Sequence, residues 1–239
     1  MKYQSVLMNP PYSADWSADK EFLQDDRFKK YGKLAPKSKA DFAFLLHGFY
    51  QLDDNGTMAV VLPHGVLFRG SAEAAIRKTL LENGNIDGVI GLPGNLFVGT
   101  TIPTVIIVLK KNRQNNDVFF IDASKDFIKG KKQNTLSEEH LKKILSTYKD
   151  RQDVDKYAHI APLDEIKEND YNLNIPRYVD TFEEEEPIDI VAVNKEIMQI
   201  DKEIEASEAE LIGMLEELAV TDDTKDIIES TIAMFRKEW

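Results

Sequence analysis

The 239-residue sequence contains no cysteine, so it can form neither a disulfide framework nor a thiolate metal site. Its four histidines are scattered without the H-x-x-x-H or H-x-E spacing of zinc sites, which argues against a bound metal. No apolar run approaches the roughly 18 residues of a membrane span, and the chain does not start with a basic and apolar leader. These absences predict a soluble, unexported protein of a reducing cytoplasm that contacts no membrane.

Acidic charge is concentrated at the C-terminal end of the chain. The formal net charge is −12, yet residues 180–239 hold 19 acidic and 5 basic side chains, which leaves residues 1–179 at +2. A near-neutral body is compatible with a polyanionic partner, whereas an acidic tail would repel stray DNA. With 42% hydrophobic residues, the chain is long enough for one domain with a sizeable core plus an appendage.

Short apolar segments alternate with amphipathic segments through residues 1–125. We expect Asp54–Gly56 to form a turn after the first helix and Ser71 to cap the second. This alternation predicts an α/β protein whose parallel sheet is covered on both faces and binds ligands beyond the carboxyl ends of its strands. The first expected strand ends at Met8, and the other expected strands span 57–63, 86–93, 104–111 and 117–122. The expected helices span 40–53 and 71–83.

Residues 126–239 divide into two further parts. Residues 126–180 read as a helical and irregular extension, with a helix over 135–149 opened by Ser137. A glutamate-rich linker at 183–187 then introduces an acidic coiled-coil tail, 181–239, in which a helix over 224–236 could fold back through a turn at 221–223. The coiled-coil prediction rests on apolar positions in steps of three and four residues at Ile190, Val193, Ile197, Ile200, Ile204, Leu211, Met214 and Leu218.

The most informative motif is Asn9-Pro10-Pro11-Tyr12, directly after the first predicted strand. The exocyclic amino group of adenine or cytosine is a poor nucleophile because its lone pair is delocalised into the ring. Two acceptors aimed at its hydrogens, the Asn9 side-chain oxygen and the Pro10 carbonyl, would return electron density to the nitrogen. The two prolines fix this backbone, and Tyr12 offers a ring on which an extruded base stacks, worth ~1–3 kcal/mol. These four residues are the catalytic candidates.

The sequence resembles the modification (methyltransferase) subunit of type I DNA restriction-modification systems. The resemblance implies the C-terminal half of a Rossmann-like class I methyltransferase sheet with flanking helices, followed by a helical tail. It also implies N6-methylation of a flipped-out adenine with S-adenosyl-L-methionine as methyl donor. The matching stretches include LMNPPY (7–12), KADFAFLLH (39–47), AVVLPHGVLFRG (59–70), VIGLPGNLFVGTTIPTVIIVLKK (89–111) and DYNLNIPRYVD (170–180).

The same resemblance implies roles for individual residues. Asn9 and Pro10 would bind the target amine, Tyr12 would stack on the flipped base, and Phe44 would lie near the adenine of the cofactor with Asp41 close by. His64 stands where relatives often carry an acid, and we assign it no catalytic role. The cations that could meet DNA phosphates, or belong to solvated surface, are Arg69, Lys110 and Lys111.

Similar enzymes carry an earlier half-domain, whose Gly-rich turn and acidic residue hold the methionine and ribose of the cofactor. Only eight residues precede Asn9, so we expect a missing N-terminal half as a partner and the first strand at an unprotected sheet edge. DNA and the specificity and restriction subunits are further implied partners, and the tail seam is a candidate contact for the specificity subunit. Two other functions remain open: a protein glutamine methyltransferase, whose substrate amide the same motif could polarise, and a catalytically silent assembly module.

Overall fold

The computed structural model describes residues 2–181, 189–219, 221 and 223–236. The chain divides into two compact units, Met1–Phe182 and Glu183–Trp239. The glutamate-rich linker expected at 183–187 lies outside the described residues. Within the part of the chain that is described, no helix is long and apolar enough to cross a membrane.

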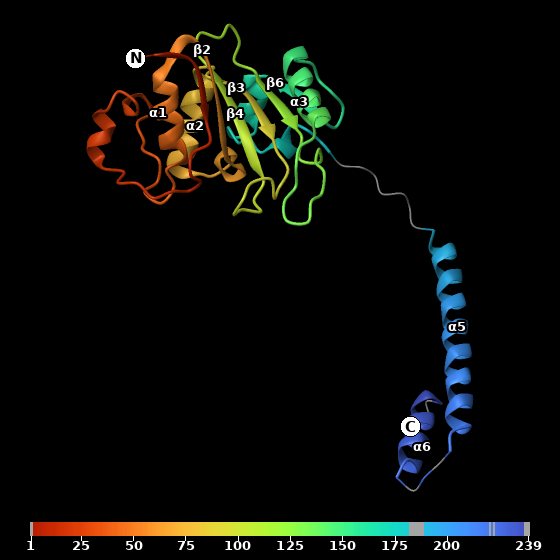
Figure 1. Ribbon diagram of the computed structural model, residues 1–239. Helices are drawn as coiled ribbons and strands as arrows, with labels where there is room; N and C mark the ends of the chain where they lie inside the picture. Colours follow the sequence, from red (N-terminus) through yellow and green to blue (C-terminus); the bar gives the residue numbers. More distant parts are fainter. Residues whose placement is uncertain (1, 182–188, 220, 222, 237–239) are drawn as a thin grey trace. The chain divides into compact units, whose positions relative to one another are not determined.

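The described strands of the first unit form one six-stranded sheet in the order β1-β2-β4-β3-β5-β6 (Figure 1). β1, β2, β3 and β5 share one direction, whereas β4 and β6 run antiparallel to their neighbours, so the expectation of a parallel sheet is wrong. β4 lies between β2 and β3 and is buried on both faces, which explains its continuous apolar run. Such a run indicates burial, but it does not indicate whether the strand runs parallel or antiparallel to its neighbours. The strands span Tyr3–Met8 (β1), Leu52–Pro63 (β2), Ile86–Gly91 (β3), Thr104–Lys110 (β4), Val118–Asp122 (β5) and Ala158–Ala161 (β6).

Helices cover the two faces of the sheet unequally. α1 (Asp41–Gln51) and α2 (Ser71–Glu82) contribute to a core on one face, and α3 (Glu138–Asp150) packs on the other face beside β5 (Figure 1). At β1 this second face is exposed to solvent. Val6 and Met8 pack towards α1 on the first face, whereas the intervening Leu7 points to the second face and is 83% exposed. The remaining described helical segments of the first unit are the 3-10 turns Lys20–Gln24, Lys29–Tyr31, His64–Leu67 and Ile175–Arg177, and α4 (Leu163–Glu168).

Three local features differ from the sequence-based expectations. The residues Asp54–Gly56 lie inside β2, which follows α1 directly, at the place where its register with β1 shifts. Gly70 rather than Ser71 is the N-cap of α2, because the helix begins at Ser71 itself. Residues 126–180 add strand β6 to the sheet, which at four residues is too short to give a strand pattern. Ser137 does cap α3, accepting a hydrogen bond from the amide of His140.

Among the described strands, the first lies at the edge of the sheet and pairs only with β2. α1 approaches this strand closely at Gly48, where an added Cβ would lie 2.5 Å from Sδ of Met8 and 2.8 Å from Cε of Met58. Glycine at this position therefore lets the helix press against both strands. The close packing holds the strand that leads into the Asn-Pro-Pro-Tyr motif.

The second unit is a helical hairpin made of α5 (Ile190–Glu216) and α6 (Lys225–Phe235). Asp189 caps α5, and Arg236 pairs with Glu216 at 2.6 Å. Phe235 faces a cavity bordered by the middle of α5, so α6 folds back on this helix. The expected turn at 221–223 includes Asp222, which lies outside the described residues. Exposed apolar side chains near the start of α5 are Ile190 (68%), Val193 (41%) and Ile197 (50%).

Candidate active site

A cavity of about 960 Å³ lies beyond the carboxyl ends of β1 and β2. Its lining comes from Lys39 and from three segments: residues 9–13 after β1, residues 63–69 at and after the end of β2, and residues 97–103 before β4. The carboxyl ends of parallel strands are where sheets of this kind bind ligands. The motif singled out from the sequence therefore lies on a cavity at this edge.

Asn9 is exposed and lines this cavity, while Pro10 behind it is buried. The hydroxyl of Tyr12 donates a hydrogen bond of 2.9 Å to Oδ1 of Asn9. Burial raises the pKa of Tyr12, so its hydroxyl keeps the proton that it donates. An amide oxygen has two lone pairs, so Oδ1 of Asn9 can still accept one hydrogen from a ligand in the cavity.

Phe97 forms the wall that faces Tyr12. The two ring centroids lie 6.3 Å apart and the ring planes meet at 85°. Phe97 belongs to the loop between β3 and β4, whose rim also exposes Val98 (89%) and Ile102 (56%). The sequence analysis did not select Phe97. The available signal was an aromatic residue in a glycine-containing loop between two buried strands.

A buried ionic network supports the loop that follows the motif. Oδ1 of Asp41 accepts a 2.7 Å hydrogen bond from the amide of Ser13, and its Oδ2 pairs with Arg69 at 2.9 Å. Arg69 also pairs with Glu73 at 3.0 Å, and burial raises the pKa of Glu73. Because Asp41 is fully buried and both its oxygens are engaged, it positions the loop that follows the motif from within the protein.

Arg77 extends this support from α2. Burial lowers the pKa of Arg77 to about 10, and its guanidinium donates to the carbonyls of Val66, Arg69 and Tyr171. Through these bonds Arg77 links the turn that carries Arg69 to Tyr171, near the C-terminal end of the first unit. Arg69 borders the cavity, but its guanidinium donates to Asp41 and Glu73.

His64 lines the cavity and meets Phe68 edge to face, with ring centroids 5.6 Å apart. Burial lowers the pKa of His64, which favours the neutral imidazole at neutral pH. None of the residues that line this cavity is an aspartate or glutamate among those described. The walls around Asn9 are therefore aromatic, apolar, neutral polar or cationic, and none of the described lining side chains is an acid.

Phe44 borders a different cavity, of about 320 Å³. Trp16 and Phe22 stack at 5.6 Å beside it, and Phe28 completes an aromatic lining. These rings come from the polar stretch before α1, which wraps over the helix. Phe44 thus lies on the same helix as Asp41 without entering the cavity of Asn9.

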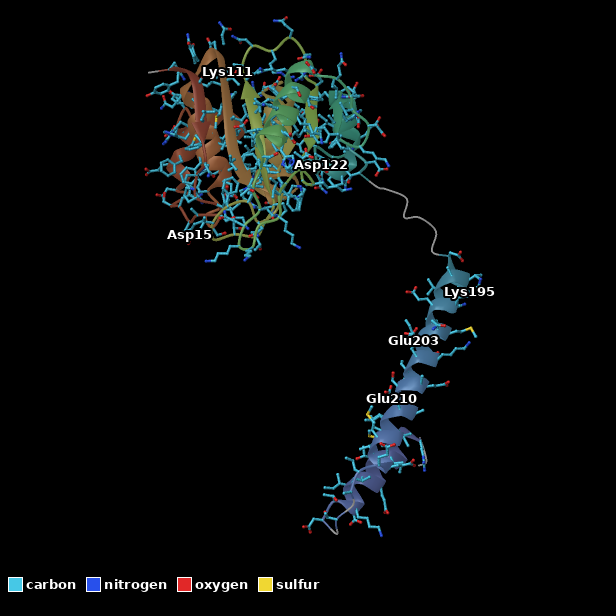
Figure 2. The ribbon with its side chains drawn as sticks, turned by 45° about the vertical axis from the view of Figure 1, so that its right-hand side comes forward. Asp15, Lys111, Asp122, Lys195, Glu203 and Glu210 are labelled. Carbon is cyan, nitrogen blue, oxygen red and sulfur yellow. The ribbon has the colours of Figure 1, made fainter. Side chains whose placement is uncertain are left out.

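Lys110 and Lys111 lie away from the site. Lys110 ends β4 and pairs with Asp87 at 3.0 Å, while the ammonium of Lys111 donates to the carbonyl of Leu52. Figure 2 shows Lys111 at the opposite end of the first unit from Asp15, which closely follows the motif. The structure brings Arg69 to the motif but not these two lysines. Among the described residues, no group of three or more His, Cys, Asp or Glu could hold a metal ion.

Comparison with known proteins gives several strong similarities. The type I restriction enzyme MpnII methylase subunit of Mycoplasma pneumoniae is 40% identical over 228 residues, covering 94% of this chain and 42% of that protein. The MjaVIII methylase subunit of Methanocaldococcus jannaschii is 34% identical, covering 91% of this chain and 39% of that protein. The chain therefore spans about two-fifths of the length of these relatives.

A solved structure agrees with these sequence matches. The type I restriction-modification system methyltransferase subunit from Streptococcus thermophilus is 68% identical, with a TM-score of 0.75 over 76% of this chain and 39% of that one. Residues 1–187 also match the family described as N-6 DNA Methylase, a stretch that includes the whole cavity around Asn9. The chain belongs to the N-6 DNA methylase family.

Proposed function

We propose that this chain is the target-base half of a DNA adenine N6-methyltransferase subunit of a type I restriction-modification system. The observation that carries the proposal is the exposed amide of Asn9, at the end of β1, on a cavity walled by Tyr12 and Phe97. Relatives named as type I methylase subunits support it. In this proposal the sheet is the C-terminal half of a Rossmann-like class I methyltransferase.

Asn9 and Pro10 would act on the amino group of an adenine drawn out of the duplex. Oδ1 of Asn9 and the carbonyl of Pro10 accept its two hydrogens, which draws the nitrogen towards tetrahedral geometry and restores its lone pair. The nitrogen would gain a bond to the methyl carbon as the bond from that carbon to the sulfonium sulfur of the donor breaks and leaves a thioether, and the nitrogen would then release one proton to solvent. Because no described carboxylate lines the cavity, activation rests on hydrogen-bond acceptors rather than on a strong base.

Tyr12 and Phe97 would hold the base in place. With ring planes at 85°, one ring can stack on the flat base while the other meets it edge on. Stacking of an unpaired base on an aromatic side chain is worth about 1–3 kcal/mol, which offsets part of the cost of leaving the duplex. The Tyr12 hydroxyl keeps Asn9 oriented before the base enters.

S-adenosyl-L-methionine, when bound, supplies the methyl group. The aromatic cavity beside Phe44 fits the adenine ring of this cofactor, since it is lined by Trp16, Phe22 and Phe28. Recognition of ribose hydroxyls commonly uses a carboxylate, and none lines this cavity among the described residues. Asp41 is engaged by Ser13 and Arg69, so we propose that the ribose and methionine are held by the other half of the enzyme.

Two exposed surfaces would meet partners in the assembled enzyme. We propose that a strand of the cofactor-binding half pairs with the free edge of β1 and covers Leu7. The exposed apolar start of α5, residues 190–197, would form a coiled-coil contact with helices of the specificity subunit. The restriction subunit and DNA complete the proposed complex.

An Asn9→Ala variant tests this function in the complex that contains the full chain. We expect transfer of labelled methyl groups to plasmid adenine to fall by about 10²–10³-fold, the usual effect of removing one hydrogen-bonding group that stabilises a transition state. Co-purification of the subunits should stay unchanged, and Asn55→Ala, an exposed asparagine in β2, is the matched control. Wild-type transfer rates in Asn9→Ala, or labelled protein in place of labelled adenine, would contradict the proposal.

A further inference from the structure

A lysine-rich hairpin, residues 125–135, lies next to the loop that carries Phe97. Its two arms are joined by backbone hydrogen bonds between Ile128 and Thr135, of 2.8 and 3.0 Å. The tip turns tightly at Gly130, where an added Cβ would lie 2.1 Å from the carbonyl oxygen of Gln133. The hairpin is therefore a defined structure. Figure 1 shows it, in green, projecting from the same end of the sheet as the yellow-green loop before β4.

Four hydrogen bonds join this lysine hairpin to the Phe97 loop. The amide and side chain of Asn134 donate to the carbonyls of Asn95 (2.8 Å) and Gly94 (2.9 Å). The side chain of Gln133 donates to the carbonyl of Leu96 (2.8 Å), and the side chain of Asn95 donates to the carbonyl of Lys132 (3.2 Å). A force on the hairpin is thus transmitted directly to the residues before Phe97.

The hairpin presents positive charge to solvent. Lys129, Lys131 and Lys132 are exposed, and none of them forms an ion pair with another described residue. The acid of the hairpin, Asp126, faces away from them, because it binds Lys143 at 2.9 Å and the hydroxyl of Tyr157 at 2.7 Å. Three uncompensated cations therefore lie on a loop that is fastened to the wall of the cavity.

We infer that the lysine hairpin contacts the phosphate backbone of the DNA beside the extruded adenine. This inference rests on the proposed function and adds a DNA-binding element that Lys110 and Lys111 cannot supply from the far end of the sheet. Phosphates are recognised mainly by Lys and Arg, whereas lysine is depleted in protein–protein interfaces. The four hydrogen bonds fasten the hairpin, which would contact the DNA backbone, to the Phe97 loop, which would stack on the base. The two loops would therefore act as one rigid support.

Salt-dependent DNA binding by the complex that contains the full chain tests the inference. The probe is a fluorescent duplex, titrated between about 50 and 200 mM KCl. Each phosphate contact contributes ~0.9 to the slope of log K against log salt, so we expect neutralising three lysines to lower that slope by about 2–3. The test variant is Lys129→Gln/Lys131→Gln/Lys132→Gln, and the control neutralises three other exposed lysines, Lys33→Gln/Lys142→Gln/Lys149→Gln.

Distinct outcomes separate this inference from the proposed function. A lower slope in the hairpin variant with an unchanged slope in the control supports the hairpin contact. An unchanged slope in the hairpin variant overturns it, even if plasmid methylation is normal. Loss of subunit co-purification in the hairpin variant also overturns it, because the hairpin would then be a protein-binding surface. A wild-type complex that methylates no adenine contradicts the proposed function, while a slope change in the same preparation still supports the hairpin contact.

Discussion

Replacing Asp41 by alanine should destabilise the first unit in the absence of any ligand. The substitution removes a fully buried carboxylate, which leaves Arg69 with only Glu73 and the amide of Ser13 without its acceptor. Breaking a buried ion pair by removing one partner costs roughly 3–5 kcal/mol. Arg69 keeps 21% of its side chain exposed, so we take the lower end, about 3 kcal/mol.

Urea unfolding followed by tryptophan fluorescence measures this loss. Trp16 stacks on Phe22 and donates a 3.0 Å hydrogen bond to the carbonyl of Pro36, so its emission reports folding of the first unit. A Trp239→Phe background leaves it as the sole tryptophan of the chain. At a denaturant slope of about 2 kcal/mol per molar urea, the midpoint should fall by about 1.5 M.

The control is Asp26→Ala, which breaks the exposed pair with Lys29. Both side chains of that pair are about 60% exposed, so solvent screens the pair and its loss should cost far less than the loss of the buried pair. Equal midpoints for Asp41→Ala and Asp26→Ala would refute the positioning role of Asp41. A wild-type midpoint combined with weakened S-adenosylmethionine binding would instead make Asp41 a cofactor ligand.

Two further predictions concern packing and pH. Gly48→Ala should lower the free energy of unfolding by about 1–3 kcal/mol through overpacking, although alanine favours helices. Gly213→Ala, where an added Cβ meets nothing within 4 Å, should stabilise α5 by about 0.5–1 kcal/mol; stabilisation by both in thermal unfolding would contradict the packing argument. Burial opposes protonation of His159, yet the hydrogen bond to Glu165 and the charges of Glu165 and Asp153 raise its pKa. The stabilising contribution of His159 is therefore complete below about pH 6.5 and is lost as the pH rises through its folded pKa. The stability difference between wild type and His159→Gln should shrink between about pH 6 and pH 8, and a constant difference in urea titrations would show that the pairing of His159 with Glu165 and Asp153 does not titrate.

Local patterns in the sequence predicted much of the fold. The proline pair after Met8 ends the first strand, because proline cannot donate to a strand ladder. The apolar runs placed β2 to β5 near their observed positions, and Ser137 marked the start of α3. Strand direction was beyond local pattern, because a strand buried on both faces has the same composition in either direction, as β4 shows.

The residues that support the site could also not be identified from the sequence. Arg69 read as a surface cation, and Asp41 as a residue near the cofactor, because their pairing joins positions 28 residues apart. Phe97 faces Tyr12 only because the loop between β3 and β4 returns to the end of β1. Contacts of this kind depend on how the strands are ordered, which composition and periodicity do not encode.

Asn9, which we propose to bind the target amine, directly follows a strand that has a hydrogen-bonded neighbour on one flank alone among the described strands. Whatever polypeptide docks along the other flank would set the twist of that strand and, with it, the height at which Asn9 stands over the base. Catalytic turnover and assembly of the enzyme would then both depend on the backbone of β1. Such an arrangement would restrain an incomplete enzyme from marking DNA before its remaining parts are in place.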